Sequence, residues 1–211
     1  ALQTDTGLSG TDKITSNGLV NITGLETGDK WQYSINGSTY NAGATLTGTT
    51  ATMAAALFSQ GSNTVTILET DVAGNTVSSS PFTFTLDTAA PSAPTLALQT
   101  DTGLSTTDKI TSNGLVNITG LETGDKWQYS INGSTYDAGT TLSGGATAAT
   151  LAASLFSQGS NTISILETDV AGNTVTNSFT YTLDTVAPII AIDGTPMGDN
   201  RINSTEDRKS T

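Results

Sequence analysis

Short stretches of alternating hydrophobic and polar residues recur along the chain. Residues 64–68 (TVTIL) and 82–86 (FTFTL) place an apolar side chain at every second position, the spacing of a strand with one buried face. Glycine, asparagine and aspartate, which favour turns, separate such stretches. Because the alternation is regular, it predicts a folded all-β protein rather than a disordered chain.

The whole pattern occurs twice. Residues 1–40 match residues 97–136 with one difference, Gly10 against Thr106, and the match resumes after a two-residue insertion in the second copy. Such near-identity indicates duplication within an array of repeats. Two full repeats, and then a tail or the start of a third, truncated repeat, are predicted at residues 1–88, 89–185 and 186–211.

Each repeat is predicted to contain seven short strands separated by turn residues. Seven short strands with this punctuation are typical of an immunoglobulin-like antiparallel sandwich. Trp127, on the third strand, and its counterpart Trp31 are expected in the two cores. Residues 149–155 could form one helical turn instead of a strand. In the second copy the strands are expected at 95–100, 114–119, 126–131, 134–142, 148–154, 162–168 and 174–183.

Composition and charge exclude several classes of function. Cysteine and histidine are absent, so the chain offers no disulfide, no thiolate, no imidazole base for a catalytic triad and no zinc site. The formal charge of −12 repels nucleic acid and anionic membrane surfaces and favours cations as partners. No apolar run is long enough to span a membrane. We therefore expect a protein that is not an enzyme, binds no nucleic acid and does not insert into membranes.

A series of motifs gives the chain a recognisable signature. The join between repeats reads LDTxAP, and TDTG, DKIT, GLETGDKWQYS and DVAGNT follow it in this order in the second copy. In this order and spacing they resemble the bacterial immunoglobulin-like repeats of giant RTX- and Bap-type biofilm adhesins. The resemblance covers residues 1 to about 188.

The resemblance implies an architecture and a role. The architecture is a series of tandem immunoglobulin-like sandwiches arranged end to end, monomeric and extracellular, at the bacterial cell surface. The role is that of an extender, which holds a distal binding domain away from the cell during adhesion or biofilm formation, with Ca²⁺ at the junctions. Repetition favours a spacer over a receptor site. The alternative is that the repeats themselves bind a glycan or protein, weakly and multivalently.

Strand direction predicts where acidic residues gather. Consecutive strands of a sandwich alternate in direction, so loops alternate between its two poles. Asp5, Asp12 and Asp87 of the first repeat should therefore face Asp169 and Asn173 of the second across the proline-containing join. Crowded carboxylates repel one another unless a cation neutralises them, and Ca²⁺ takes 6 to 8 oxygen ligands. These five residues are the predicted calcium site at the junction.

The same reasoning places half-sites at the outer poles. Asp101, Asp108 and Asp184 should point toward the third unit, and Asp71 and Asn75 toward a preceding repeat.

A second interpretation is that each aspartate caps its own turn without a metal. For the turns at 71–75 and 169–173 both interpretations stay open. For Asp87 and Asp184 we favour the metal. Strand direction places Glu122 and Asp125 at the same junction, but we favour their interpretation as solvated turn residues over coordination of the metal.

Overall fold

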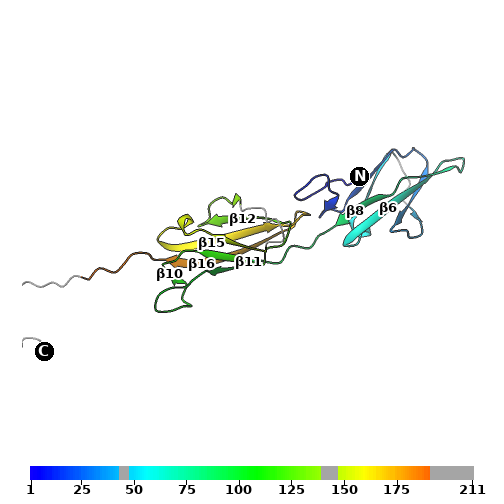
Figure 1. Ribbon diagram of the computed structural model, residues 1–211. Coiled ribbons are helices and arrows are strands. Elements are labelled where there is room, and N and C mark those ends of the chain that lie inside the picture. The colour runs from blue at the N-terminus through cyan, green and yellow to red at the C-terminus, as the bar shows by residue number, and fades with distance from the viewer. Residues whose placement is uncertain (43–47, 139–146, 191–211) are drawn as a thin grey trace, which may run out of the picture.

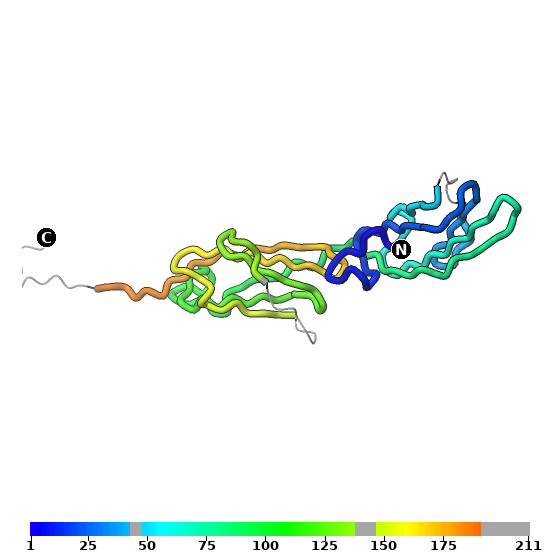
Figure 2. Tube along the Cα trace, turned by 90° about the horizontal axis from the view of Figure 1, so that it is seen from above, coloured from blue at the N-terminus to red at the C-terminus, as the bar shows by residue number. Residues whose placement is uncertain are grey.

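The computed structural model describes residues 1–42, 48–138 and 147–190. Two β-sandwiches follow one another along an elongated particle, with the first repeat at one end and the second extending from it (Figures 1 and 2). The fold class predicted from the sequence, tandem all-β sandwiches arranged end to end, is confirmed. Among the described residues no helix is both long and apolar enough to cross a lipid bilayer.

The first repeat contains one larger and one smaller sheet. The larger has the strand order β1-β8-β6-β3-β4, with β7 also paired to β6, and the smaller is formed by β2 and β5. All pairs are antiparallel except β1 with β8. The strands are β1 (Ile14–Thr15), β2 (Val20–Thr23), β3 (Lys30–Ile35), β4 (Asn41–Ala42), β5 (Thr50–Met53), β6 (Gly61–Thr70), β7 (Thr76–Ser78) and β8 (Phe82–Leu86).

The second repeat has the same plan. Its larger sheet runs β10-β16-β15-β12-β13 and its smaller sheet β14-β11-β9. Here too one pair is parallel, β10 with β16. The strands are β9 (Thr95–Leu98), β10 (Ile110–Thr111), β11 (Val116–Thr119), β12 (Lys126–Ile131), β13 (Asp137–Ala138), β14 (Ala148–Leu151), β15 (Gly159–Thr168) and β16 (Thr174–Leu183).

Comparison with the predicted strands shows where the sequence pattern is ambiguous. The strands predicted at 126–131 and 174–183 coincide with β12 and β16. Residues 148–155 form both expected structures, because β14 is followed by a 3-10 turn, Ala153–Leu155. Of the strand predicted at 134–142, the described part contains β13, and residues 139–146 lie outside the description.

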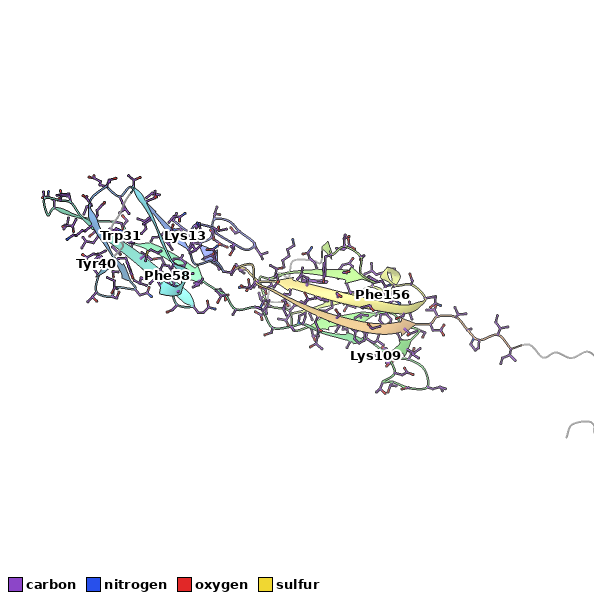
Figure 3. All side chains as sticks on the ribbon, turned by 180° about the vertical axis from the view of Figure 1, so that it is seen from behind. Lys13, Trp31, Tyr40, Phe58, Lys109 and Phe156 are labelled. Carbon is purple, nitrogen blue, oxygen red and sulfur yellow. The ribbon has the colours of Figure 1, made fainter. Side chains whose placement is uncertain are left out.

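The cores lie between the two sheets of each repeat. Trp31 is 6% exposed and Trp127 4%, so the prediction that both are buried is confirmed. Phe156 meets Tyr181 edge to face at 5.4 Å, and Phe58 meets Phe84 in the same way at 5.0 Å. The labelled Trp31, Phe58 and Phe156 mark these two separate cores in Figure 3. Each repeat therefore buries its own apolar side chains and is a domain in its own right.

Candidate metal site at the junction between the repeats

The junction brings the end of β8 against the pole of the second repeat that faces the first. The chain leaves β8 at Leu86 and enters β9 at Thr95, with Pro91 and Pro94 of the intervening segment both buried. Proline fixes φ and favours extended neighbours, so the chain continues forward instead of folding back. The first repeat thus faces the pole of the second that carries residues 169–173 (Figures 1 and 2).

Among the residues that the structure describes, three hydrogen bonds join the two repeats directly. The Asn173 side chain donates through Nδ2 to the carbonyl oxygen of Asp87 at 2.8 Å. Two more bonds come from the loop at residues 3–13 of repeat 1. The Thr6 hydroxyl donates to the carbonyl oxygen of Ala171, and the Leu8 N–H donates to that of Val170. Strand direction therefore predicted correctly which loops meet at the junction.

Asp169 is held by its own turn. Its Oδ1 accepts the Asn173 backbone N–H at 2.8 Å, and its Oδ2 accepts the Asn173 side-chain amide, also at 2.8 Å. The turn at the outer pole has the same two bonds between Asp71 and Asn75, at 2.8 and 2.7 Å. These bonds lower the pKa of Asp71 because they stabilise its carboxylate. We call residues 71–75 and 169–173 the Asp–Asn turns.

Four of the predicted aspartates lie in the loops at residues 3–13 and 99–109 and bond within those loops. Asp5 and Asp101 each accept a backbone N–H through Oδ2 at 3.0 Å, while Oδ1 is buried without a hydrogen-bond partner. Asp12 and Asp108, both exposed, each cap the N–H two residues further on at 3.0 Å. Asp5 and Asp101 thus keep a free oxygen, whereas Asp12 and Asp108 have the geometry of turn residues.

The aspartates at the ends of the last strands also cap local backbone. Oδ1 of Asp87 and of Asp184 accepts the N–H two residues further on at 3.0 Å. Asp87 contacts the second repeat through its carbonyl oxygen rather than its carboxylate. Across the described ranges 1–42, 48–138 and 147–190, no group of three or more carboxylates is arranged to hold a metal ion. Asp87, Asp169 and Asn173 meet at the junction, whereas Asp5 and Asp12 bond within their own loop.

Two carboxylates at this pole are buried, although the sequence predicted Asp125 there as a solvated residue and did not indicate Glu167 as part of the site. Glu167, on β15, is completely buried; its Oε1 accepts the Glu122 N–H at 2.6 Å, and its Oε2 has no hydrogen-bond partner. Asp125 is 5% exposed, and its Oδ2 also has no hydrogen-bond partner. The interpretation of Asp125 as a solvated turn residue is therefore wrong, because the structure buries it beside other acids.

Glu122 also has a structural role that its sequence context did not indicate. Although the side chain is exposed, its Oε1 accepts the N–H of Ser92 at 2.8 Å, so it holds the segment between the repeats. The interpretation of Glu122 as simply solvated is therefore incomplete. The signal for Glu167 was present in the sequence, because Ile163, Ile165 and Glu167 fall on the same alternating face of β15.

Burial and mutual repulsion perturb the acids of this pole. Burial raises the pKa of Asp125 to about 6, and the negative charges of Glu167, Glu122, Asp169 and Asp87 add to the rise. The pKa of Glu167 is also raised, mainly by burial. A carboxylate oxygen that is buried and has no donor is costly unless a proton or a cation meets it. The donor set fits Ca²⁺, which prefers carboxylate, amide and carbonyl oxygens.

The first repeat repeats this arrangement at its outer pole. A surface hollow of about 200 Å³ is lined by acidic and polar side chains together with one valine. Burial raises the pKa of Asp29 there, helped by the charges of Glu69 and Asp71. The lining residues are Glu26, Asp29, Glu69, Asp71, Asn75, Thr76 and Val77.

Comparison with known proteins gives one family and several distant structural similarities. The family model of the bacterial Ig-like domain matches residues 1–88 and 89–185. No curated protein matches the chain. Fibronectin(III)-like modules of Clostridium thermocellum CbhA are 14% identical and have a TM-score of 0.40, with 81% of this chain and 88% of that chain covered.

Two adhesin structures are similar at the same level. A tetra-tandem repeat from the extending region of a large adhesion protein is 19% identical, with a TM-score of 0.37. A Ca²⁺-stabilized adhesin that helps an Antarctic bacterium bind ice is 21% identical, with a TM-score of 0.38. The alignments cover 81% and 84% of this chain, but only 47% and 48% of those structures. At such identities and TM-scores, nothing about function follows from the similarity.

Proposed function

The chain belongs to the bacterial Ig-like domain family, and from that premise we propose that it is part of the extender region of a bacterial surface adhesin. In this role the repeats form an extracellular rod that holds a distal binding domain away from the cell, in adhesion or biofilm formation. The partners of each repeat are its neighbours along the chain. The support is the end-to-end packing of two near-identical domains. The family is one of structural and binding modules, and we propose no catalytic activity.

The proposal includes Ca²⁺ at the junction as the element that stiffens the rod. One observation carries it: Asp125 and Glu167 bury unpartnered carboxylate oxygens at the pole that faces Asp87. A cation there would neutralise charges that otherwise repel one another and would draw the carboxylates together. Extracellular calcium modules bind at about 10⁻⁴ to 10⁻³ M. At a hundredfold excess over Kd, binding adds about 2.7 kcal/mol to the folded state.

The five residues predicted at the junction enter this proposal to different degrees. Asp169 and Asn173 supply side-chain oxygens beside the buried acids, and Asp87 supplies a carbonyl or carboxylate oxygen. Asp5 keeps a buried free oxygen in its own loop. Asp12 is exposed and capped locally, so it contributes charge more than coordination.

The outer poles carry the corresponding half-sites. Asp71 and Asn75 belong to the acidic hollow of repeat 1, which has no neighbour across it among the described residues. Asp101, Asp108 and Asp184 repeat the local geometry of the corresponding residues in repeat 1. A half-site with fewer ligands should bind the cation more weakly than the junction.

Calorimetric titration with CaCl₂ tests the metal directly. The unmodified chain should show a stronger site and a weaker one. Asp125→Gln combined with Glu167→Gln should remove the stronger site, whereas the matched pair Asp29→Gln with Glu69→Gln should remove the weaker one. The absence of any saturable binding up to millimolar calcium would refute the metal part of the proposal and leave the extender role to be tested by particle shape.

A further inference from the structure

A loop of the first repeat packs directly on the Asp–Asn turn of the second. We call residues 3–13 the first loop of repeat 1, and residues 99–109 the corresponding loop of repeat 2. The Thr6 hydroxyl donates to the carbonyl oxygen of Ala171 at 2.6 Å, and the Leu8 N–H donates to that of Val170 at 3.2 Å. Both acceptors are backbone atoms, and no carboxylate takes part in either bond.

Two glycines make this approach possible. Gly7 has φ 98°, and a Cβ there would overlap the carbonyl oxygen of Val170 and lie 2.8 Å from the carbonyl carbon of Ala171. A Cβ on Gly172, which has φ 93°, would lie 2.9 Å from the Gly7 nitrogen and 3.0 Å from its Cα. The two backbones therefore touch at a point where neither can carry a side chain.

The same two segments occur elsewhere in the chain without this contact. Gly103 and Gly74 are the counterparts of Gly7 and Gly172, with φ of 105° and 91°, and a Cβ on either would meet nothing within 4 Å. Leu8 is 43% exposed in the contact, whereas its counterpart Leu104 is fully exposed. Local backbone conformation is thus the same in both copies, and only the docking partner differs.

The turn shows the same contrast in burial. Ala171 is 1% exposed, whereas its counterpart Ala73 lies on the surface. Val170 is half-buried, whereas Val72 is 87% exposed. The first loop thus covers apolar surface of the turn as well as bonding to its backbone.

We propose that the first loop of one repeat and the Asp–Asn turn of the next form a docking joint that needs no cation and that recognises another repeat of this sequence. Gly7 and Gly172 determine its specificity, because a side chain at either position would separate the two backbones. The joint fixes the relative orientation of the domains. Repulsion among the acids beside it, mainly Asp125, Glu167 and Asp87, opposes that orientation. It goes beyond the extender role and does not depend on calcium.

The test compares matched glycine variants in EDTA. Gly7→Ala and Gly103→Ala place a methyl group at similar φ, 98° and 105°, so both carry similar local strain. Among the described residues, only Gly7→Ala collides with a neighbouring domain. Gly172→Ala and Gly74→Ala form the second matched pair. Circular dichroism checks that each variant is folded.

Interdomain order is read from a spin-label distance. The chain has no cysteine, so Ser62→Cys with Ser160→Cys labels two equivalent exposed positions, one on each repeat. In EDTA the parent and the Gly103 and Gly74 variants should give a single peak in the distance distribution, broader than the peak in calcium because the carboxylates beside the joint then repel one another. The Gly7 and Gly172 variants should lose that peak. A parent without a single peak, or Gly7→Ala indistinguishable from Gly103→Ala, would overturn the joint.

A second pair covers the case in which the glycine variants unfold. Thr6 and Thr102 make the same hydroxyl contacts within their own repeats, and within the described part of the chain only Thr6 also reaches a neighbouring domain. Thr6→Val should therefore broaden the distance distribution more than Thr102→Val. Equal effects would contradict the joint. Since all samples contain EDTA, failure of calcium binding leaves this test unaffected.

Discussion

The two Asp–Asn turns have identical sequences and different surroundings. Within each turn the aspartate accepts the same two hydrogen bonds from the asparagine. At the junction the turn packs against the neighbouring repeat, whereas at the outer pole most of it is exposed. The conformation of the turn is therefore local, and its burial is a property of the array. A repeat of this kind carries a complete turn but only half of a joint.

The acidic residues beside the two turns also differ in their surroundings: Asp125 and Glu167 lie at the junction, and Asp29 and Glu69 lie at the outer pole. Glu167 is completely buried, whereas its counterpart Glu69 is half-buried. Asp125 and Asp29 both have a raised pKa, but only for Asp125 does Asp87, from the other repeat, add to the cause. Joining two repeats thus concentrates negative charge at their interface, which is where a cation has most to neutralise.

The largest expected effect tests whether the two cores are equivalent. Trp31→Ala and Trp127→Ala should each lower the free energy of unfolding of their own domain by about 3–5 kcal/mol, because each removes a large buried side chain. Differential scanning calorimetry of the two variants checks this. A loss below about 1 kcal/mol in one domain only would show that the repeats are not equivalent in packing.

Calcium should distinguish the two acidic clusters. At a hundredfold excess over Kd, the cation should stabilise the second domain by about 2.7 kcal/mol. The first domain should gain less, because its cluster has no strand end facing it among residues 1–42, 48–138 and 147–190. Thermal unfolding in calcium and in EDTA, followed for each domain, measures the difference. Equal stabilisation of both domains would remove the special status of the junction.

Without calcium, acid should stabilise the junction through Asp125. The pKa of Asp125 in the folded protein is about 6, above its ordinary value of 3.8. Its contribution to the free energy of unfolding is therefore complete below pH 3.8 and disappears as the pH rises through 6. This shift corresponds to at most about 3 kcal/mol, and solvent screening reduces it. Denaturant unfolding of Asp125→Asn in EDTA should lack this part of the pH dependence. Asp29→Asn, the matched control, should change it less, and the reverse order would contradict the comparison.

The smallest expected effect isolates one bond between the repeats. Asn173→Ala and Asn75→Ala both remove the side-chain amide bond within an Asp–Asn turn, but Asn173→Ala also removes the bond to the carbonyl oxygen of Asp87. The difference between the two variants should be about 1 kcal/mol. Denaturant unfolding measures it. No difference would mean that this bond adds nothing to the junction.

Strand periodicity and strand direction predicted most of the fold. Residues 126–131 and 174–183 alternate without interruption, and they fold as predicted. Strand direction alone determines at which pole of a sandwich each loop lies, because consecutive strands alternate in direction. It therefore placed Asp87 and Asn173 correctly at one junction.

The burial of Asp125 escaped prediction for a physical reason. Asp125 follows a glycine and precedes a lysine, the pattern of an exposed turn, and its burial depends on how the loop after β11 folds over the end of β15. The contact between Gly7 and Gly172 depends on two loops distant in sequence and on the course of the proline-containing segment. Glycines with positive φ recur throughout the chain, so their presence alone did not single out these two.

Small-angle scattering tests the central claim most directly: the repeats form an end-to-end rod that calcium stiffens. In millimolar calcium the chain should scatter as an elongated particle, and EDTA should shorten its average length and increase its flexibility while both domains stay folded. Asp87→Ala, or Asp125→Gln with Glu167→Gln, should reproduce the EDTA behaviour in calcium. A compact particle in calcium would contradict the rod. Identical scattering curves in calcium and EDTA would contradict calcium stiffening and would leave Asp87 and Asp169 as turn residues without a metal.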